Sequence, residues 1–329
     1  MTGIELCRDF YNEIIKNQLT INHGAALLGG GSEVLGFDTE LSQDHDWFAR
    51  CHIFTDGTTE EITLNLPKTF KGFETKVEIH KARDFYKAVL GFDVYEMTEI
   101  DWLTIPSQLL CELTKGAVFR ESETLTYLRE KLQFYPKDIH LYILAAAWER
   151  IGQEMAFMGR CGENGDETGS ALLCGHLTTY IMRLCFLYEK EYAPYWKWFG
   201  KAFSNLSCAK KIEPIIKSAL AATDWRTREK HLSQAYILLG ETHNKANLTP
   251  PVKPTIAPYY TRPFAVPNAA DFQTALRAEI KSKKIKALPR GLGAIDQISD
   301  QTDFLGHNDF RLTIKNIWLK GAHSEYTKQ

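Results

Sequence analysis

The strongest constraint on the fold is a long stretch in which apolar residues recur every three or four positions. From about Glu123 this spacing runs through residues 128–151, 172–187 and 212–239, and it is the pattern of amphipathic helices. Such helices bury their apolar faces against one another. We therefore expect residues 121–248 to form a helical bundle domain.

The part of the chain before this stretch has a mixed pattern. Residues 4–19 carry apolar side chains at helical spacing, whereas residues 25–28, 44–54 and 76–80 are expected to be strands. Strands and helices mixed over so short a length indicate a compact domain with a small sheet. We assign residues 1–120 to this domain, and the whole chain to the α+β class.

The remaining residues, 249–329, are expected to form a strap and a helical tail. Six prolines fall within residues 249–267, and neither a helix interior nor a central strand accommodates them. An extended strap across the surface is therefore predicted there. A final helix is expected over residues 269–283.

Composition limits the partners of this chain. The formal net charge is only -2, which gives no global basic field and weakens the case for a protein that grips long nucleic acid through clustered Lys and Arg. We find no signal-peptide pattern at the N-terminus and no apolar run of membrane-spanning length. The seven cysteines contain no C-x-x-C pair. We therefore expect a cytoplasmic protein with reduced thiols and no zinc site built from cysteines.

The most informative local feature is the apolar run of residues 25–28, which leads directly into Gly29-Gly30-Gly31-Ser32. Glycines allow a backbone to approach a triphosphate closely, and Ser32 adds a hydroxyl donor. If a helix begins at Ser32, its unpaired amides would also face the anion. Alone, however, such a turn is more often a flexible loop than a phosphate site.

A pair of acids follows the glycine turn. Asp44 and Asp46 alternate within a predicted strand, so both side chains would leave the same face with Cα atoms about 6.5–7 Å apart. Carboxylates at this spacing can share one hard cation or bridge two. Their mutual repulsion favours a bound metal. An isolated Asp-x-Asp is commonly a surface feature.

The combination is much more specific than either part. An apolar strand, then Gly31-Ser32, then eleven intervening residues and Asp44-x-Asp46 resemble the signature of the DNA polymerase beta-like nucleotidyltransferase superfamily. The resemblance implies one or two Mg²⁺ ions and a nucleoside triphosphate, usually ATP. His45 departs from the pattern, because an apolar residue is usual there, and we expect His45 to pack in the core.

The resemblance also implies a third carboxylate on a neighbouring strand. Glu78 alternates with Val77 and Ile79, which sends its side chain to the face opposite these two apolar residues. A charge there must be solvated, paired or liganded. We assign Glu78 as this acid, acting as the general base for the acceptor hydroxyl. Glu74 is the second choice, and an edge-strand glutamate facing water is the alternative.

The chain as a whole resembles an uncharacterised, mainly bacterial nucleotidyltransferase-like family, a domain of unknown function. Its layout is also similar to that of the aminoglycoside nucleotidyltransferases, which implies a helical domain closing over the nucleotide. The motifs that carry the family resemblance are residues 101–104 (Asp-Trp-Leu-Thr), 128–132 (Leu-Arg-Glu-Lys-Leu), 135–138 (Tyr-Pro-Lys-Asp), 159–170 (Gly-Arg-Cys-Gly-Glu-Asn-Gly-Asp-Glu-Thr-Gly-Ser) and 192–200 (Tyr-Ala-Pro-Tyr-Trp-Lys-Trp-Phe-Gly).

Three residues of the helical domain are candidates for binding the nucleotide. Lys197 lies among aromatic residues and resembles a lysine that such domains extend to the triphosphate, although a solvated lysine is an equal alternative. Within residues 159–170, Arg160 is assigned to phosphate and Asp166 to ribose or acceptor. The alternative is that this segment, through Asp166 or Thr168, only caps the helix that follows.

These observations predict an enzyme that transfers a nucleoside monophosphate, AMP from ATP in the simplest case, to a hydroxyl acceptor with release of pyrophosphate. The acceptor is expected to be a small molecule or a protein. One alternative is a catalytically inactive nucleotide-binding regulatory or antitoxin-like module. Another is transfer to an RNA end, against which the near-neutral charge and the lack of an aromatic-basic stripe both argue.

Overall fold

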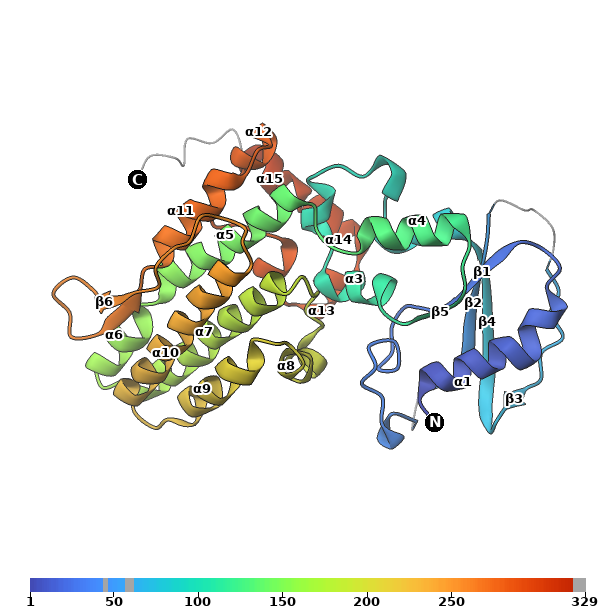
Figure 1. The fold of residues 1–329 in the computed structure, drawn as a ribbon, viewed down its shortest axis with the longest axis horizontal. Coiled ribbons are helices and arrows are strands. Elements are labelled where there is room, and N and C mark those ends of the chain that lie inside the picture. Colours follow the sequence, from blue (N-terminus) through green and yellow to red (C-terminus); the bar gives the residue numbers. More distant parts are fainter. Residues whose placement is uncertain (44–46, 57–61, 322–329) are drawn as a thin grey trace. The chain divides into compact units, whose positions relative to one another are not determined.

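The computed structural model describes residues 1–43, 47–56 and 62–321. The chain forms two compact units (Figure 1). The first unit comprises Met1–Thr98 and Ile105–Phe134, and the second comprises Glu99–Thr104 and Tyr135–Gln329. The fold is α+β, as the sequence predicted, because the first unit holds a mixed sheet and the second is mainly helical.

A mixed five-stranded sheet forms the centre of the first unit. Its strand order is β3-β4-β2-β1-β5. The strands β2 and β4 run parallel, and the other neighbouring pairs are antiparallel. The bounds are β1 (His23–Leu27), β2 (Ala49–Thr55), β3 (Thr69–Phe70), β4 (Phe73–Lys81) and β5 (Ala117–Arg120). The strands expected over residues 25–28 and 76–80 are thus confirmed in position, with shifted ends.

The helices of the first unit surround this sheet. They are α1 (Gly3–Phe10), α2 (Ala82–Leu90), α3 (Ser107–Thr114) and α4 (Glu123–Leu132). Thr2 and Glu5 form a capping box at the start of α1, which satisfies amides that the first helical turn leaves unpaired. A π-helical turn, Tyr11–Ile15, and a 3₁₀ turn, Lys16–Gln18, continue α1, so the helix expected over residues 4–19 is three joined segments.

Helix α4 belongs to the first unit, beyond residue 120 where the sequence suggested a boundary. The guanidinium of Arg129, a residue of α4, donates hydrogen bonds to the carbonyl oxygens of Leu113, Thr114 and Lys115, at 2.8–3.2 Å. These carbonyls lie at the end of α3, where a helix leaves acceptors unpaired and favours a cation. Arg129 therefore fastens α4 to α3.

One face of the sheet packs on α1. Leu6 and Phe10 of α1 share a core cluster with Trp47, Cys51 and Ile53. Residues at odd positions of β2 thus point into this core, and alternation sends the even positions to the opposite face. This division fixes which side chains of β2 are available for chemistry.

The second unit contains a helical bundle, as expected. The helices are α5 (Lys137–Glu154), α6 (Phe157–Glu163), α7 (Glu167–Tyr188), α8 (Trp196–Ser204), α9 (Ala209–Ala221) and α10 (Trp225–Lys245) (Figure 1). Trp148 of α5 is fully buried and donates a hydrogen bond from Nε1 to the Tyr188 hydroxyl at 2.6 Å. The bundle core therefore includes paired polar groups as well as apolar side chains.

The tail packs onto this bundle and differs from the expected strap. A two-stranded antiparallel hairpin, β6 (Ile256–Pro258) and β7 (Ala265–Pro267), forms within the proline-rich segment. Pro258 and Pro267 lie at strand ends, where a missing amide donor is tolerated. Phe264 and Val266 are buried, so this segment contributes to the core.

Helices complete the tail. They are α11 (Ala269–Glu279), α12 (Lys283–Lys286), α13 (Thr302–Gly306), α14 (Asn308–Thr313) and α15 (Lys315–Gly321). Phe272 of α11 stacks on Trp148 of α5 with ring centroids 4.4 Å apart. The final helix expected over residues 269–283 is therefore α11, which ends at Glu279.

Among the described residues, α7 alone has the length and apolar composition needed to cross a membrane. In the bundle, however, its residues Leu177, Ile181 and Leu184 are fully buried. Core helices of folded domains commonly pass the same compositional test, and the packing of α7 is of that kind.

Candidate functional site

The candidate site lies at the sheet edge where β1 ends and β2 and β4 begin. Strand β1 runs antiparallel to β2, and Ala26 pairs with His52. Strand β4 runs parallel to β2, so that Arg50 pairs with Lys76 and His52 with Glu78. The glycine turn that follows β1 and the first residues of β2 and β4 are therefore neighbours.

The side chains of Arg50, His52 and Glu78 share the sheet face opposite α1. Cys51 and Ile53 pack in the core beneath α1, and Val77 packs against that same core. Alternation along each strand then places the intervening residues on the other face. The predicted orientation of Glu78, opposite Val77, is what the strand adopts.

The glycine segment forms a turn, and no helix begins at Ser32. The chain turns over residues 32–36, and the amide of Phe37 donates to the carbonyl oxygen of Ser32 at 2.9 Å. A helix beginning at Ser32, which the sequence left possible, therefore does not supply amides for an anion here. Gly31 has φ +136°, which L residues rarely adopt, and a Cβ atom there would also meet the Glu33 carboxylate, so glycine is strongly favoured at this position.

Arg50 and Glu33 form an ion pair at this turn. The Arg50 Nη2 atom lies 2.6 Å from Glu33 Oε1 and 2.5 Å from the carbonyl oxygen of Gly30. The side chains of Arg50 and Glu33 are only 16% and 5% exposed, so the charges are shielded from water. The pair braces the glycine turn and puts a cation beside it.

Glu78 is surrounded by three basic side chains. Lys76 Nζ lies 2.8 Å from its Oε1 atom, whereas Oε2 lies 3.3 Å from His80 Nε2 and 3.8 Å from His52 Nδ1. The hydrogen bond from Lys76 lowers the pKa of Glu78, although partial burial acts against this shift. Glu74, the second choice, is exposed and pairs across the sheet with Thr69.

His52 is the buried member of this group. Burial lowers the pKa of His52 to about 4, so the ring is neutral near pH 7 and can act as a ligand. Its Nδ1 atom is buried without a hydrogen-bond partner. The nitrogen and oxygen atoms of His52, Glu78 and His80 all lie within 4.8 Å of one another.

The predicted acids Asp44 and Asp46, and His45 between them, lie outside the described residues. The strand that they were expected to start begins instead at Ala49. Trp47, the first described residue after them, is 7% exposed and packs in the core beneath α1. The chain is thus anchored immediately after Asp46.

The other predicted site residues belong to the second unit. Lys197 is exposed at the start of α8, with Nζ 5.2 Å from the Trp198 ring. Arg160 is exposed on α6. Asp166 is the N-cap of α7, and its Oδ1 atom accepts a hydrogen bond from the Gly169 amide at 2.7 Å. Asp166 therefore caps α7, which is the alternative role that the sequence left open.

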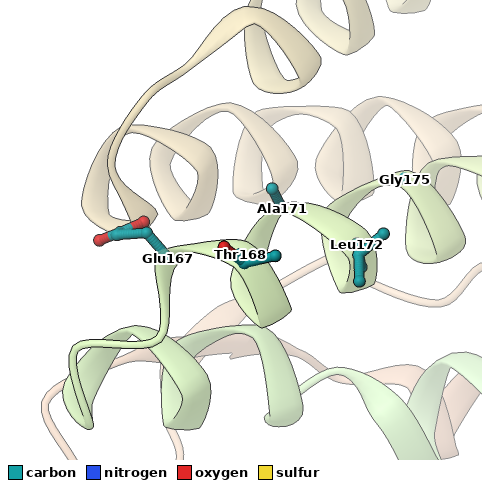
Figure 2. A pocket seen from close by; sticks show the side chains of 5 residues that line it. All are labelled: Glu167, Thr168, Ala171, Leu172 and Gly175. Atoms are coloured by element: carbon teal, nitrogen blue, oxygen red, sulfur yellow. The ribbon is translucent and has the colours of Figure 1, made fainter.

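A hollow of about 510 Å³ lies beside the start of α7, lined by Glu167, Thr168, Ala171, Leu172 and Gly175 (Figure 2). Its lining offers one carboxylate and one hydroxyl but no cation. The Glu167 carboxylate is already bound by buried Arg228. A triphosphate needs positive charge, so this hollow does not suit a nucleotide.

The sequence interpretation missed Arg50, His52 and His80. Arg50 and His52 alternate with apolar residues on one strand, and His80 follows Ile79 on another, so alternation could have marked them as members of the polar face. What the sequence could not provide is the parallel pairing of β2 and β4, which brings them beside Glu78.

Part of the chain is similar to a known protein family. Residues 102–199 match a family described as a domain of unknown function (DUF4037). This confirms the part of the resemblance that concerns a family of unknown function, and most of the quoted motifs lie within the matched residues. No curated protein matches the chain.

Among solved structures, the chain is similar to a nucleotidyltransferase-like protein from Exiguobacterium sibiricum. The two sequences are 12% identical, and the similarity covers 77% of this chain and 82% of that one, with a TM-score of 0.33. Similarity at this level identifies neither a reaction nor a site.

Proposed function

We propose that this protein is a nucleotidyltransferase that moves a nucleoside monophosphate, AMP from ATP in the simplest case, to a hydroxyl acceptor. One observation carries the proposal. The turn that contains Gly31 and Ser32 follows β1 at the same sheet edge where β2 begins, shortly after Asp44-x-Asp46, and Glu78 stands on the adjacent parallel strand. The glycine turn, the start of β2 and Glu78 thus lie at one sheet edge, which supports the proposal.

The carboxylates of the motif are of the donor type that Mg²⁺ prefers. We propose Asp44 and Asp46 as ligands of one or two Mg²⁺ ions, and the hydrogen bond from Lys76 lowers the pKa of Glu78 on β4. Magnesium bound there would supply positive charge opposite the triphosphate oxygens. The Ser32 hydroxyl can donate to a phosphate, and the backbone at Gly29 and Gly30 is open beside it, because a Cβ atom at either position would meet nothing within 4 Å.

The proposed chemistry is an in-line displacement at the α-phosphorus. The acceptor hydroxyl gives its proton to the Glu78 carboxylate as its oxygen forms a bond to the α-phosphorus. The bond between the α-phosphorus and the bridging oxygen breaks, and pyrophosphate leaves with the electron pair. Positioning and charge neutralisation would supply most of the rate enhancement.

Arg50, Lys197 and Arg160 are proposed to offset negative charge on the triphosphate. Arg50 already stands beside the glycine turn. Lys197 and Arg160 are exposed cations of the second unit. The assignment of Lys197 rests on a resemblance to the lysine of similar helical domains, and that of Arg160 on its place in the Gly-rich polar segment 159–170. Asp166 caps α7 through a hydrogen bond from the Gly169 amide, and its assignment to ribose or acceptor stays a proposal.

We further propose a cytoplasmic setting and a small-molecule or protein acceptor. Five of the seven cysteines are buried and none forms a disulfide in the structure, as suits a reducing compartment. The near-neutral charge speaks against nucleic acid as the partner. The burial of α7 within the bundle speaks against a membrane partner.

Incubation of the protein with labelled ATP, Mg²⁺ and a fractionated cell extract tests this function. Transfer should label one fraction and release pyrophosphate, and the double variant Asp44→Ala/Asp46→Ala should abolish both while keeping the fold. Asp84→Ala is the matched control, because Asp84 is an exposed acid on α2. Nucleotide binding without pyrophosphate release would instead support the inactive regulatory module.

A further inference from the structure

The polar face of the sheet carries three side chains arranged like metal ligands. His52 pairs with Glu78, and Phe54 pairs with His80, across the parallel strands β2 and β4. His52, Glu78 and His80 therefore share one face. His52 and Glu78 are neighbours across the strands, and Glu78 and His80 are two residues apart on β4. All three ligand atoms lie within 4.8 Å of one another.

The unpaired nitrogen of His52 is the observation that points to a ligand. The His52 side chain is only 10% exposed, and its Nδ1 atom has no hydrogen-bond partner. A hydrogen bond joins the ring to the backbone of Leu28, which leaves Nδ1 as the free lone pair. A buried acceptor without a partner is costly, whereas a metal ion would satisfy it. An imidazole held by a backbone carbonyl is common around bound metals.

The Glu78 carboxylate divides its two oxygen atoms between two tasks. Oε1 is taken by Lys76 at 2.8 Å, while Oε2 faces the two imidazoles at 3.3 and 3.8 Å. Lys76 can therefore keep its hydrogen bond while Oε2 binds a metal. Phe85 of α2 packs against both rings, with centroids 5.3 Å from His52 and 4.9 Å from His80, and so limits their rotation.

The donor set selects the class of metal. Two imidazole nitrogens and one carboxylate oxygen suit Zn²⁺ and similar transition metals, whereas Mg²⁺ prefers oxygen alone. Bonds of about 2.0–2.1 Å around a tetrahedral ion would hold the ligand atoms about 3.4 Å apart. The distances of 3.3 and 3.8 Å are close to this value, so small side-chain movements would complete the site.

We propose that His52 Nδ1, Glu78 Oε2 and His80 Nε2 bind one divalent transition-metal ion of the Zn²⁺ class, with a fourth position open to solvent or substrate. The site does not depend on nucleotidyl transfer, although it shares Glu78 with the proposed reaction. A metal bound to Oε2 would occupy the proposed general base, so the ion would act as an inhibitor of transfer.

Titration of the dialysed full-length protein with Co²⁺, followed by visible absorption and by competition with Zn²⁺, tests this site directly. One equivalent should bind to the wild type. His80→Gln should weaken this binding at least about tenfold, the usual scale for disturbing a metal site. Lys76→Met should retain or strengthen it, because the competing ammonium group is gone.

His176→Gln is the matched control, because His176 is a half-exposed histidine of the second unit that pairs with Glu154. It should bind Co²⁺ like the wild type, and circular dichroism should show that every variant is folded. Failure of the wild type to bind one equivalent, or full retention of binding in His80→Gln, would overturn the proposal. The latter result would mean that thiols or other histidines hold the ion.

Discussion

Arg50 and Glu33 join the second strand of the sheet to the glycine turn, with Arg50 Nη2 2.6 Å from Glu33 Oε1. The same Nη2 atom reaches the carbonyl oxygen of Gly30. The conformation of the turn thus depends on an ion pair whose charges are largely withdrawn from water. Because the turn contains the proposed phosphate-binding residues, this pair links the stability of the fold to the site.

Glu33→Ala should destabilise the first unit by about 3 kcal/mol, since removing one member of a buried pair leaves the other charge uncompensated. Urea unfolding followed by circular dichroism measures the loss. Lys217→Ala is the control, because exposed Lys217 forms an ion pair with partly buried Glu213 within α9. Its effect should stay below about 1 kcal/mol. Equal losses in the two variants would contradict a structural role for the Arg50–Glu33 pair.

Gly31→Ala should destabilise the turn by about 1–3 kcal/mol, because φ is strongly positive and the new Cβ would collide with the Glu33 carboxylate. Nucleotide affinity should fall as well. Gly30→Ala is the control in the neighbouring position of the same turn. A Cβ atom at Gly30 would meet nothing within 4 Å, so this variant should be close to the wild type. Thermal unfolding and ATP titration compare the two variants. Similar behaviour of both would show that the turn tolerates side chains generally.

Buried histidines of the second unit should make its stability fall as the pH is lowered. Burial lowers the pKa of His140 and of His243 to about 4, from an ordinary value of 6.5. Between these values the unfolded chain binds protons that the folded chain does not. Stability that is fully present above pH 6.5 is therefore lost progressively towards pH 4, at up to ~1.4 kcal/mol per pH unit for each histidine.

Urea unfolding across this pH range measures the slope. His140 Nε2 lies 2.8 Å from the carbonyl oxygen of Leu187, and glutamine can keep a donor there. His140→Gln should therefore remove about half of the slope that the two histidines contribute. A slope unchanged by the substitution would show that other groups cause the pH dependence.

Asp166 allows a capping role to be separated from a ligand role. Asp166→Ala should lower stability by about 1 kcal/mol, the usual effect of losing an N-cap, whereas serine can replace the cap. Asp166→Ser should therefore restore stability and leave the KM for nucleotide unchanged. A serine variant that is stable but has a raised KM would return Asp166 to the nucleotide site.

Local sequence patterns predicted most of the fold. Apolar spacing located the bundle helices, and alternation located β4 and the orientation of Glu78. The hairpin of β6 and β7 was missed because its prolines sit at strand ends, which a count of prolines does not reveal. Strand β5, only four residues long, was missed because its pairing with β1 depends on residues far apart in the chain.

The candidate site was predicted less completely than the fold. The glycine turn and Glu78 could be found because each belongs to a short local pattern. Arg50, His52 and His80 could not, because their role arises from the register between β2 and β4. A sequence shows which residues alternate on one strand, but the partner strand is selected by packing across the whole sheet.

Transfer from ATP labelled at either the α- or the γ-phosphate tests the central claim most directly. With purified protein, Mg²⁺ and the responsive extract fraction, α-label should appear on the acceptor and γ-label in pyrophosphate. Both signals should vanish in Asp44→Ala/Asp46→Ala and persist in Asp84→Ala. Label from the γ-phosphate on the acceptor, or transfer that survives in the double variant, would contradict nucleotidyl transfer at this site.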